Sequence, residues 1–373
     1  MRRERVARSE KGQPLELPGS PSSLLATSSS LTLVIQTAFL GDVVLTTGLL
    51  TALAARFGPV DVVTTPAALA LVETHPAVRR AIAWDKRGAE RGVRGLWRLA
   101  RRLMRERYAR AYLPHRSLRS AALALLAEIP ERVGFAGGAG ALTYTRSVAR
   151  PTEGHEAERL LALAESAGNG PAGAGAPGRA AVGLTLTRDD RRAAEEWLAR
   201  HGVAPGFVAL APGSIWGTKR WPYYAELART LDRPLVIVGS GEDRELGLEV
   251  AAAAPERTSV AAGELPLRGS AALLERAALL VTNDSAPLHL ASAVGTPVVA
   301  IFGPTVPGFG FGPRGPRDRI VQHPALSCRP CSSHGPRVCP LLHHRCMKEV
   351  AVARVREAVE AELREQSTVN GQR

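Results

Sequence analysis

The sequence predicts an α/β protein of two Rossmann-like halves with parallel sheets, and three observations support this prediction. From Leu31 onward, short β-branched or apolar runs alternate with longer amphipathic segments, which is typical of βαβ units. A segment rich in Gly, Ala and Pro at 168–183 interrupts the alternation, which then restarts. The chain has 373 residues, more than a single domain usually holds. A linker at 168–183 between two domains of ordinary size explains all three observations.

The first domain is expected at 31–167, after an N-terminal extension at 1–30 whose Pro and Ser content predicts disorder. Its predicted strands are Leu31–Gln36, Val60–Thr64, Arg80–Trp84, Ala111–Pro114 and Arg132–Phe135. The predicted helices between them are Val43–Arg56, Pro66–Glu73, Val93–Arg105 and Leu118–Ala127, most of them more polar on one face.

The second domain is expected at 184–350, before a C-terminal helix and tail at 351–373. Its predicted strands are Phe207–Ala211, Leu235–Val238, Leu279–Thr282 and Val298–Phe302. Its predicted helices are Asp189–His201, Tyr223–Leu231, Glu242–Ala254, Leu273–Ala278 and Pro287–Val294. Ligands of open α/β sheets bind beyond the C-terminal ends of the strands, so the functional residues of both halves should gather around one shared cleft.

Composition and charge limit the classes of function. The chain is 45% apolar and 5% aromatic, as a globular protein is, and no run reaches the roughly 18 uninterrupted apolar residues of a membrane span. A Pro- and Ser-rich spacer separates Arg2 and Arg3 from the apolar stretch at 31–40, unlike in a secretory signal, so a cytoplasmic protein is expected. The net charge of +13 favours anionic partners, but a solvated helix face explains the arginines between Arg79 and Arg119 as well as a binding patch does.

The first motif spans residues 36–46 and places Gly41 and Asp42 where a strand passes into a helix. Asp42 stands at an N-cap position, where a carboxylate commonly accepts backbone N–H bonds, and taken alone this structural role is the more common one. A carboxylate at the C-terminal edge of the first strand would also face the cleft and could take a proton from a bound hydroxyl. Asp42 is therefore the candidate catalytic base.

The second motif spans residues 210–222 and again joins a strand, a Gly-containing loop and a helix start. Ser214 and Thr218 supply hydroxyl groups, and Lys219 and Arg220 supply cations. Together with backbone N–H groups of the loop, this set fits a diphosphate whose negative charge grows as it leaves. A surface loop with an incidental lysine is the plain alternative. So many small and cationic residues after a buried strand favour binding.

The third motif spans residues 281–297. Asp284 or Ser285 is expected to cap a helix with Pro287 in its first turn, so that free backbone N–H groups point at the cleft and can hold a phosphate. His289 falls about one turn into this helix. A lone helical histidine is usually structural, but inside an anion-binding terminus it can donate a hydrogen bond to a bound donor.

These three segments resemble glycosyltransferase family 9, which includes the ADP-heptose:lipopolysaccharide heptosyltransferases, particularly the type that adds the second heptose. The resemblance extends from about Leu31 to Val350. Its specific parts are GDVVLTTGL at 41–49, PGS and KRWP within 212–222, and TNDSxxxHLAxAxGTPVVAxFGPT at 282–305. It implies a GT-B fold of two facing Rossmann-like domains, with the acceptor held mainly by the first and the nucleotide sugar by the second.

The resemblance also implies an activity and roles for individual residues. The activity is inverting transfer of heptose from ADP-heptose to the lipopolysaccharide inner core, with no cofactor required and no nucleic acid as a partner. Asp42 matches the family's catalytic base, Lys219 its diphosphate-binding lysine, and three residues its donor-contacting motif: Asp284, Ser285 and His289. Here Ala286 and Pro287 stand where many members have glycine after the Ser or Thr, which affects the shape of that turn. Further candidates for donor contact are Ser214, Thr218, Ala286, Gly239 and Glu242.

The basic charge and a lipid-linked acceptor together predict a location. They favour a cytoplasmic enzyme that touches the inner-membrane surface transiently.

All four cysteines fall in one segment, at Cys328, Cys331, Cys339 and Cys346. A CxxC pair followed by two thiols fits a tetrahedral structural zinc site, and a cytoplasmic chain should not rely on disulfides. The spacing is not a standard zinc-finger pattern, so a reduced thiol cluster and a pair of disulfides stay open beside zinc. A catalytic metal is not expected, because the segment follows the last donor-side strand.

Other functions fit parts of the sequence. A transferase of another nucleotide sugar to a different glycan, or a GT-B sugar-nucleotide epimerase, would share the fold. Asp42 together with the KRWP segment favours transfer over epimerisation, and the presence of both Asp42 and Lys219 argues against a transferase that has lost turnover. A basic nucleic-acid-binding protein would need one stripe of cations with interleaved aromatics, whereas the arginines are scattered and aromatics are scarce.

Overall fold

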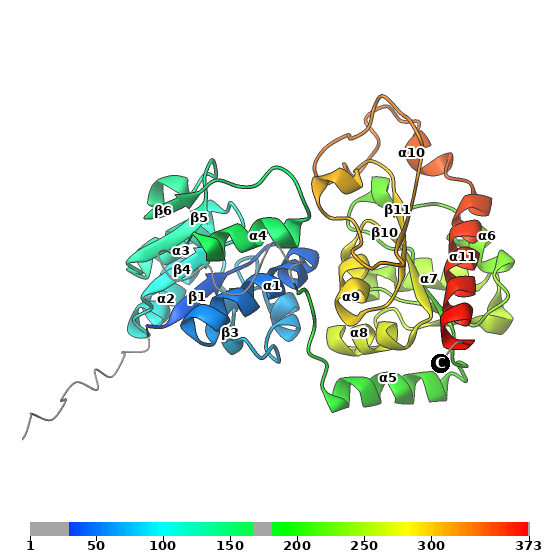
Figure 1. Ribbon diagram of the computed structural model, residues 1–373, viewed down its shortest axis with the longest axis horizontal. Coiled ribbons are helices and arrows are strands. Elements are labelled where there is room, and N and C mark those ends of the chain that lie inside the picture. The colour runs from blue at the N-terminus through cyan, green and yellow to red at the C-terminus, as the bar shows by residue number, and fades with distance from the viewer. Residues whose placement is uncertain (1–29, 167–180, 372–373) are drawn as a thin grey trace, which may run out of the picture. The chain divides into compact units, whose positions relative to one another are not determined.

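The computed structural model describes residues 30–166 and 181–371, and it confirms the predicted α/β fold with two parallel six-stranded sheets (Figure 1). The chain from Leu31 onward forms one compact unit. The predicted extension at 1–30 lies almost wholly outside the described residues, and so does most of the predicted linker at 168–183. The two sheets fall on either side of that linker, as the interrupted alternation predicted.

The first sheet has the strand order β3-β2-β1-β4-β5-β6 with every neighbouring pair parallel. Leu33 of the central strand β1 pairs with Asp61 on one side and Ala111 on the other. The strands are β1 Thr32–Ile35, β2 Val60–Thr64, β3 Val78–Ala83, β4 Arg110–Leu113, β5 Glu131–Phe135 and β6 Arg146–Val148. The helices are α1 Leu40–Phe57, α2 Gly92–Arg105, α3 Leu118–Leu126 and α4 Glu156–Glu165, with 3₁₀ turns at Pro66–Leu71 and Ala141–Thr143.

Helices cover both faces of this sheet because side chains alternate between faces along each strand. Leu33 and Ile35 of β1 pack with α2 and α3 in one cluster. Val34, between them, packs on the opposite face in a separate cluster that contains residues of α1 and α4. The cluster that contains Val34 continues into α8 Leu267–Arg276 and α9 Ala286–Val294 of the second domain. The cluster that contains Leu33 and Ile35 includes only residues before 145. Helices α2 and α3 therefore form the outer layer of the first domain.

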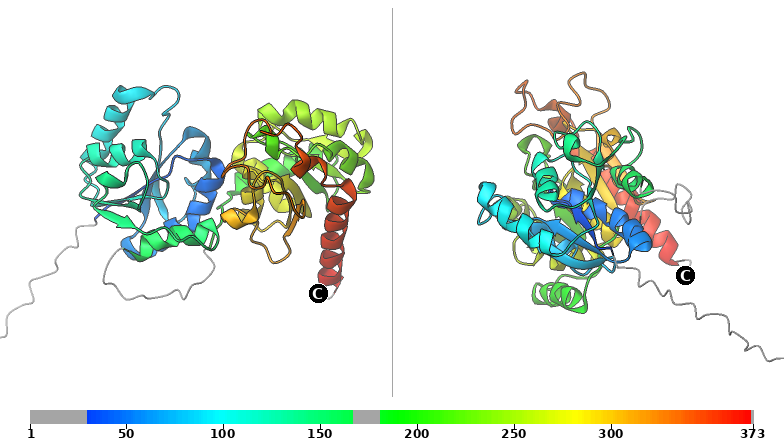
Figure 2. Two further views of the ribbon diagram at one scale, coloured as in Figure 1. Left: turned by 90° about the horizontal axis from the view of Figure 1, so that it is seen from above. Right: turned by 90° about the vertical axis from the view of Figure 1, so that its left-hand side faces the viewer.

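The second sheet repeats the same connectivity, with the order β12-β11-β10-β7-β8-β9 and parallel pairs throughout. Its strands are β7 Val208–Ala211, β8 Leu235–Ile237, β9 Thr258–Val260, β10 Leu279–Asn283, β11 Val298–Phe302 and β12 Arg319–Gln322. The remaining helices are α5 Arg188–Arg200, α6 Tyr224–Thr230, α7 Arg244–Ala251, α10 Arg345–Lys348 and α11 Val352–Gly371, with short 3₁₀ turns at Gly217–Lys219, Gly241–Asp243, Pro255–Arg257 and Pro307–Phe309. The predicted C-terminal helix is α11, red in Figure 2, which packs on α6 and on strands β10 to β12.

Strand order fixes where a site can form. In each sheet the order reverses between two central strands, β1 and β4 in the first and β7 and β10 in the second. The crevice at such a switch point, beyond the strand C-termini, is the usual ligand site of this architecture. The three motifs follow β1, β7 and β10, which are three of these four strands. The topology thus brings together segments far apart in sequence.

Three strands that the sequence did not predict share one physical feature that explains why they were missed. Strands β6, β9 and β12 lie at sheet edges, are three or four residues long and are mostly only partly buried. Edge strands lack the continuous apolar run that marks a central parallel strand. Helix α4 was also not predicted, although Glu156 and Glu158 in its first turn are typical of a helix N-terminus.

Helix α1 is the single helix in the described ranges whose length and apolar composition would suffice to cross a membrane. Ten of its 18 residues are buried, and it packs against α4 and α9. Its hydropathy is explained by burial between the two sheets, as in the core helix of a folded domain.

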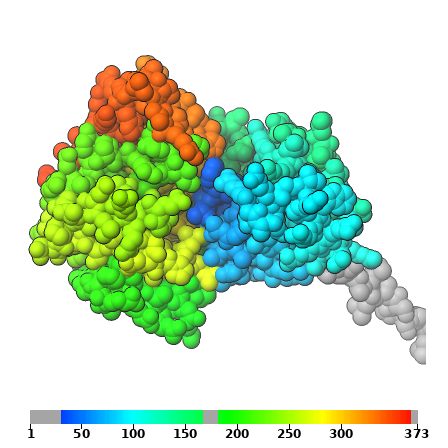
Figure 3. Space-filling view, turned by 180° about the vertical axis from the view of Figure 1, so that it is seen from behind, coloured from blue at the N-terminus to red at the C-terminus, as the bar shows by residue number. Residues whose placement is uncertain are grey.

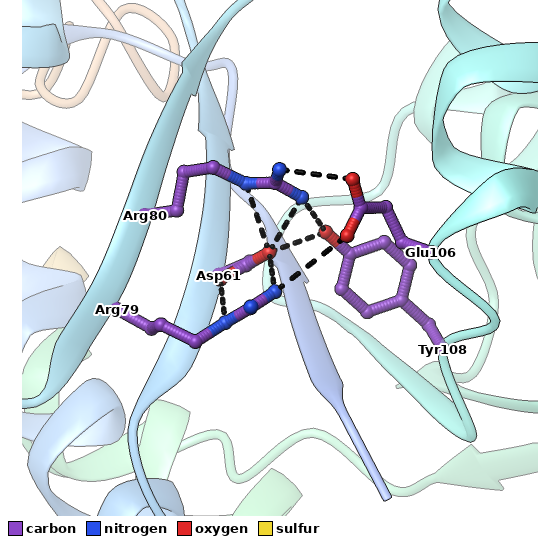
Figure 4. A network of polar contacts seen from close by, with 5 residues as sticks. All are labelled: Asp61, Arg79, Arg80, Glu106 and Tyr108. Carbon is purple, nitrogen blue, oxygen red and sulfur yellow. Dashed lines mark hydrogen bonds and ion pairs between the residues drawn. The ribbon is translucent and has the colours of Figure 1, made fainter.

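A polar network fastens the edge of the first sheet that is opposite the strand C-termini (Figure 4). The fully buried Asp61 carboxylate accepts hydrogen bonds from Arg79 Nε at 2.8 Å, Arg80 Nη2 at 3.0 Å and the Tyr108 hydroxyl. Arg80 Nη1 also donates to Glu106 at 2.9 Å, just beyond the end of α2. A buried charge is tolerated when it is paired and hydrogen-bonded in this way. The network ties β2 and β3 to the connection between α2 and β4, and so fixes the end of α2.

Candidate active site

A cavity of about 1740 Å³ lies beyond the C-terminal ends of both sheets. Its walls come from all three motifs and from the loops after β4, β6, β8 and β11. Nine predicted site residues line it: Asp42, Ser214, Lys219, Gly239, Glu242, Asp284, Ser285, Ala286 and His289. Thr218 does not. The sequence motifs therefore do meet at one place.

Asp42 is not the N-cap of α1, contrary to the prediction. The helix begins at Leu40 and Phe39 is the N-cap residue, with extended backbone angles. Asp42 is the third helical residue, and its Oδ2 accepts the Phe39 backbone N–H at 3.1 Å. A carboxylate there satisfies an otherwise unpaired donor of the first turn and benefits from the helix dipole. The capping role and the cavity-facing position belong to the same side chain.

The surroundings of Asp42 raise its basicity. Burial raises the pKa of Asp42, while the Phe39 N–H, His334 and Arg150 act to lower it. Arg150 also forms an ion pair with Glu156, and both residues line the cavity. Burial likewise raises the pKa of Glu156, against the opposing effect of Arg150. Asp42 and Glu156 are thus both poorly solvated carboxylates, and Arg150 is the cation that lies near both.

On the opposite wall, Lys219 is held in a buried ion pair. Its Nζ lies 2.6 Å from Asp284 Oδ2, and the Thr305 hydroxyl donates to the same oxygen at 2.6 Å. A charge-assisted pair with a further hydrogen bond holds a lysine in one conformation. Asp284 contacts Lys219 and Thr305, and its predicted contact with the donor stays a prediction. Its position in the cavity wall still leaves it beside any ligand that Lys219 binds.

Asn283, which the sequence analysis did not single out, joins the second and third motifs. Its side-chain Nδ2 donates to the Pro212 carbonyl at 2.9 Å, and its Oδ1 accepts the Trp221 backbone N–H at 3.1 Å. Both ends of the loop that carries Lys219 are therefore pinned to the end of β10. A fully buried amide with satisfied donors and acceptors specifies one loop conformation.

Helix α9 presents its N-terminus to the cavity. Ser285 is its N-cap residue, as predicted, but the hydroxyl makes no cap bond and lies 3.4 Å from Thr282 Oγ1. Ser285, Ala286 and Pro287 all line the cavity. Pro287 has no N–H and the Leu288 N–H donates to the Ser285 carbonyl at 3.1 Å, so the N–H groups that this terminus can offer to a ligand are those of Ser285 and Ala286.

His289, one turn further along α9, is buried and uncharged at neutral pH, because burial lowers its pKa to about 4. Helix α1 approaches this ring so closely that a Cβ atom on Gly41 would lie 2.5 Å from His289 Cδ2. Glycine at position 41 therefore permits the two helix N-termini to face one cavity.

Thr218, predicted to contact the donor, does not line the cavity and forms contacts within the protein. Its hydroxyl donates to the Pro336 carbonyl, and its own carbonyl oxygen lies 2.8 Å from His344 Nε2. The cysteine-containing segment 328–346 thus packs on the loop of Lys219. Its residues Ser333, His334 and Arg337 line the cavity. The cysteine-containing segment thus forms part of the cavity wall.

The four cysteines are free thiols, so the disulfide alternative does not describe this structure. Across residues 30–166 and 181–371, no group of three or more His, Cys, Asp or Glu side chains is arranged to hold a metal ion. Zinc binding by Cys328, Cys331, Cys339 and Cys346 stays a prediction.

Cavity residues that the sequence did not predict include His115, Arg116, Arg150, Glu156, His334 and Arg337. Arg150 and Glu156 follow β6, the edge strand that was not predicted. His115 and Arg116 follow the predicted strand at 111–114, so its C-terminal end was the signal that could have found them. His334 and Arg337 lie in a long loop with no local pattern, and only the tertiary structure brings them to the site.

Two Rossmann-like sheets around one cavity, with a carboxylate on one wall and a lysine and helix N-terminus on the other, define a glycosyltransferase of the GT-B fold. The model of glycosyltransferase family 9 (heptosyltransferase) matches residues 96–341. Lipopolysaccharide heptosyltransferase 2 of Salmonella typhimurium is 30% identical over 292 residues, 74% of this chain and 84% of that protein.

Solved structures agree with this assignment. ADP-heptose lipopolysaccharide heptosyltransferase II of E. coli superposes with a TM-score of 0.74 at 26% identity, covering 90% of this chain and 99% of that one. A family 9 glycosyltransferase of Veillonella parvula shares the fold, with a TM-score of 0.78 at 23% identity over 90% and 98% of the two chains. The chain belongs to glycosyltransferase family 9, the heptosyltransferase family, and is a glycosyltransferase enzyme.

Proposed function

We propose that the protein transfers heptose from ADP-heptose to the inner core of lipopolysaccharide, with inversion at the anomeric carbon and without a metal ion. The single observation that carries this proposal is the placement of Asp42 and Lys219 in the walls of one cavity. The relatives support the choice of sugar and acceptor, since two of those quoted above are named for lipopolysaccharide and one of these two also for ADP-heptose.

Asp42 acts as the base. As the acceptor hydroxyl attacks the anomeric carbon, its proton passes to the Asp42 carboxylate and a new C–O bond forms. The bond from that carbon to the phosphate oxygen breaks, and ADP leaves with the electron pair from the opposite face. A pKa raised by burial makes this carboxylate a stronger base than an exposed aspartate while it is ionised. One displacement of this kind inverts the anomeric centre.

Lys219 and the N-terminus of α9 stabilise the leaving group. Negative charge grows on the β-phosphate as the bond breaks, and a cation and backbone N–H groups fixed in advance offset that charge. The Asp284 pair at 2.6 Å holds Lys219 in place before the donor binds. His289, uncharged at neutral pH, can donate or accept a hydrogen bond there. These groups supply the charge compensation that the proposed step requires.

The first domain provides the acceptor side. His115 and Arg116 follow β4 into the cavity, and Arg150 lies beside Asp42. Lys86 Nζ donates to the Thr37 carbonyl at 2.6 Å and braces the loop that precedes Asp42. An anionic, lipid-linked core oligosaccharide fits these cations. The enzyme would then work in the cytoplasm, in transient contact with the inner membrane.

A direct test incubates the protein with a panel of nucleotide sugars and a truncated core acceptor, with and without a chelator. ADP release that depends on ADP-heptose and on the acceptor, and that persists with the chelator, is expected. NMR of the product should show the anomeric configuration inverted relative to the donor. Turnover with a different nucleotide sugar alone would reassign the donor, and loss of turnover in chelator would contradict metal independence.

A further inference from the structure

The outer face of α2 combines cations with exposed apolar side chains. Between residues 86 and 119 the sequence has twelve Lys and Arg against two Glu, in a chain whose net charge is +13. The helix buries Gly95, Leu99, Ala100 and Leu103 against the first sheet. Its opposite side carries the exposed residues Arg91, Val93, Arg94, Trp97, Arg98, Arg101, Arg102 and Arg105. In the space-filling view, the cyan surface near residue 100 lies open on one side of the molecule (Figure 3).

The charges on this face are not neutralised by the protein. In the part of the chain that the structure describes, Arg94, Arg98, Arg102 and Arg105 form no ion pair or hydrogen bond through their side chains. This contrasts with Arg79 and the residues of its network in Figure 4, which satisfy a buried carboxylate. Unpaired cations in such number raise the local positive potential and attract anionic surfaces. A helix face used only for solubility would ordinarily intersperse charges of both signs.

Apolar side chains stand among these cations. Val93 is 70% exposed and Trp97 is 44% exposed, and they lie four residues apart on the same side of α2. Leu118, at the start of the neighbouring helix α3, is 57% exposed. Tryptophan and aliphatic side chains beside arginines are the composition of helices that lie in a membrane interface.

A second, smaller cavity lies at this face, between α2, α3 and the loop after β3. It has a volume of about 570 Å³ and is lined by Lys86, Arg87, Leu96, Ser117, Leu118, Arg119 and Ala122. Lys86 and Arg87 follow β3, Leu96 lies in α2, and the other four residues are the α3 N-cap Ser117 and residues of α3. His115 and Arg116, just before them in sequence, line the main cavity. Lys86, which lines the smaller cavity, donates to the Thr37 carbonyl at 2.6 Å and to the Thr37 hydroxyl at 2.8 Å, in the loop that precedes Asp42.

We propose that the face formed by α2 and the start of α3 docks on an anionic phospholipid bilayer, with Trp97, Val93 and Leu118 inserted among the headgroups. The arginines contact lipid phosphates, and the smaller cavity receives a headgroup. The role of docking in catalysis rests on the proposed function, because a lipid-linked acceptor would then be presented to Asp42 from the membrane side. Docking itself is measurable without any substrate.

A nucleic acid would be the other polyanion to consider. The exposed aliphatic side chains Val93 and Leu118 have no counterpart to contact on a phosphate backbone, whereas a bilayer interface accepts them. The face also bears a single exposed aromatic ring, Trp97, where single-stranded nucleic acid binding uses successive stacked rings. The bilayer is therefore the partner that this surface fits.

Flotation of the full chain with phosphatidylcholine vesicles, with and without phosphatidylglycerol, tests the proposal. The wild-type protein should bind only the vesicles that contain phosphatidylglycerol, and high salt should weaken binding. The triple variant Arg94→Gln, Arg98→Gln, Arg102→Gln should bind them roughly a hundredfold more weakly. Trp97→Ser should weaken binding at unchanged net charge. The matched control Arg188→Gln, Arg200→Gln, Arg233→Gln removes the same charge from exposed positions of the second domain and should leave binding unchanged.

Two further measurements separate the outcomes. Transfer to a short soluble acceptor should be unchanged in the α2 variants and tests the proposed function alone. The docking proposal fails if the wild type does not bind anionic vesicles, or if the α2 and control variants lose binding equally. It also fails if the wild type binds single-stranded RNA in preference to vesicles, because the face would then serve nucleic acid.

Discussion

The two walls of the cavity carry their key charges in opposite ways. In the first domain, the Asp42 carboxylate accepts one backbone hydrogen bond, from Phe39, and forms no ion pair within the described residues. In the second domain, Lys219 is buried and paired with Asp284 at 2.6 Å, and Thr305 braces the pair. The wall from the first domain thus leaves the Asp42 carboxylate without an ion-pair partner among the described residues, and the wall from the second domain holds the Lys219 ammonium group in an ion pair.

The difference follows from what each group has to do in the proposed reaction. A base must accept a proton, so a partner that neutralised Asp42 would compete with the substrate hydroxyl and lower its basicity. A group that stabilises a leaving phosphate must already be in place when charge develops, so pairing and burial serve Lys219. Electrostatic environment thus distinguishes proton transfer from charge stabilisation within one site.

The largest effect is expected from Asp42→Asn. The amide can still accept the Phe39 N–H but cannot take a proton, so kcat should fall by about 10²–10⁴-fold. The stability of the fold should not fall at neutral pH, because burial disfavours the charged form that the substitution removes. Steady-state kinetics and urea unfolding measure the two quantities. Wild-type kcat in this variant would remove Asp42 from the mechanism.

Lys219→Met should lower kcat by about 10²–10³-fold, because the leaving phosphate loses its fixed cation. Lys219→Arg retains the charge but not the shape of the ammonium group, so it should recover only part of the loss. The comparison of both variants with the wild type distinguishes charge from packing. Equal activity of the methionine and arginine variants would show that the charge of Lys219 is not used.

Asp284→Asn should have a smaller effect than Lys219→Met, because Lys219 keeps its charge but loses its fixed partner. If Asp284 acts through Lys219, the double variant should be no worse than Lys219→Met alone, since residues of one network do not add. Kinetics of the two single variants and the double variant measure this coupling. Additive losses would instead show that Asp284 contacts the donor independently, as the sequence resemblance implied.

Arg150→Met should change the pH dependence more than the maximum rate. The base must be ionised, so the rate falls as pH falls through the pKa of Asp42, which burial raises and Arg150 lowers. Removing Arg150 should therefore move the acid limb of kcat to higher pH, with a loss that is several-fold at acidic pH and small at alkaline pH. A rate-pH profile of both proteins measures the shift. A shift of the acid limb toward lower pH would contradict the role of Arg150 in lowering the pKa of Asp42.

Sequence reasoning located the site well where local pattern and topology agree. Parallel strands with continuous apolar runs were recognisable, and residues in the segments that follow them, such as Asp42 after β1 and Lys219 after β7, could be placed beyond the strand C-termini of the two sheets. The helix boundary at Phe39 was missed by three residues, because the capping bond from Asp42 forms only in the folded turn. Pattern alone does not distinguish the first residue of a helix from its third.

The remaining misses depended on tertiary structure. Arg150 and Glu156 follow a three-residue edge strand with no apolar run. Thr218 was predicted to face a ligand, but whether its hydroxyl meets a phosphate or the Pro336 carbonyl depends on how a loop more than a hundred residues away packs. The same packing brings His334 to the cavity. No local pattern encodes such contacts.

The most direct test of the contrast between the walls is calorimetric titration of ADP into the wild type, Asp42→Asn and Lys219→Met. The account predicts that Asp42→Asn binds ADP with unchanged affinity, because the base contacts the acceptor side. It predicts that Lys219→Met binds ADP roughly tenfold to a hundredfold more weakly, the loss of one charged hydrogen bond. Weakened ADP binding in Asp42→Asn together with unchanged binding in Lys219→Met would contradict the assignment of the two walls.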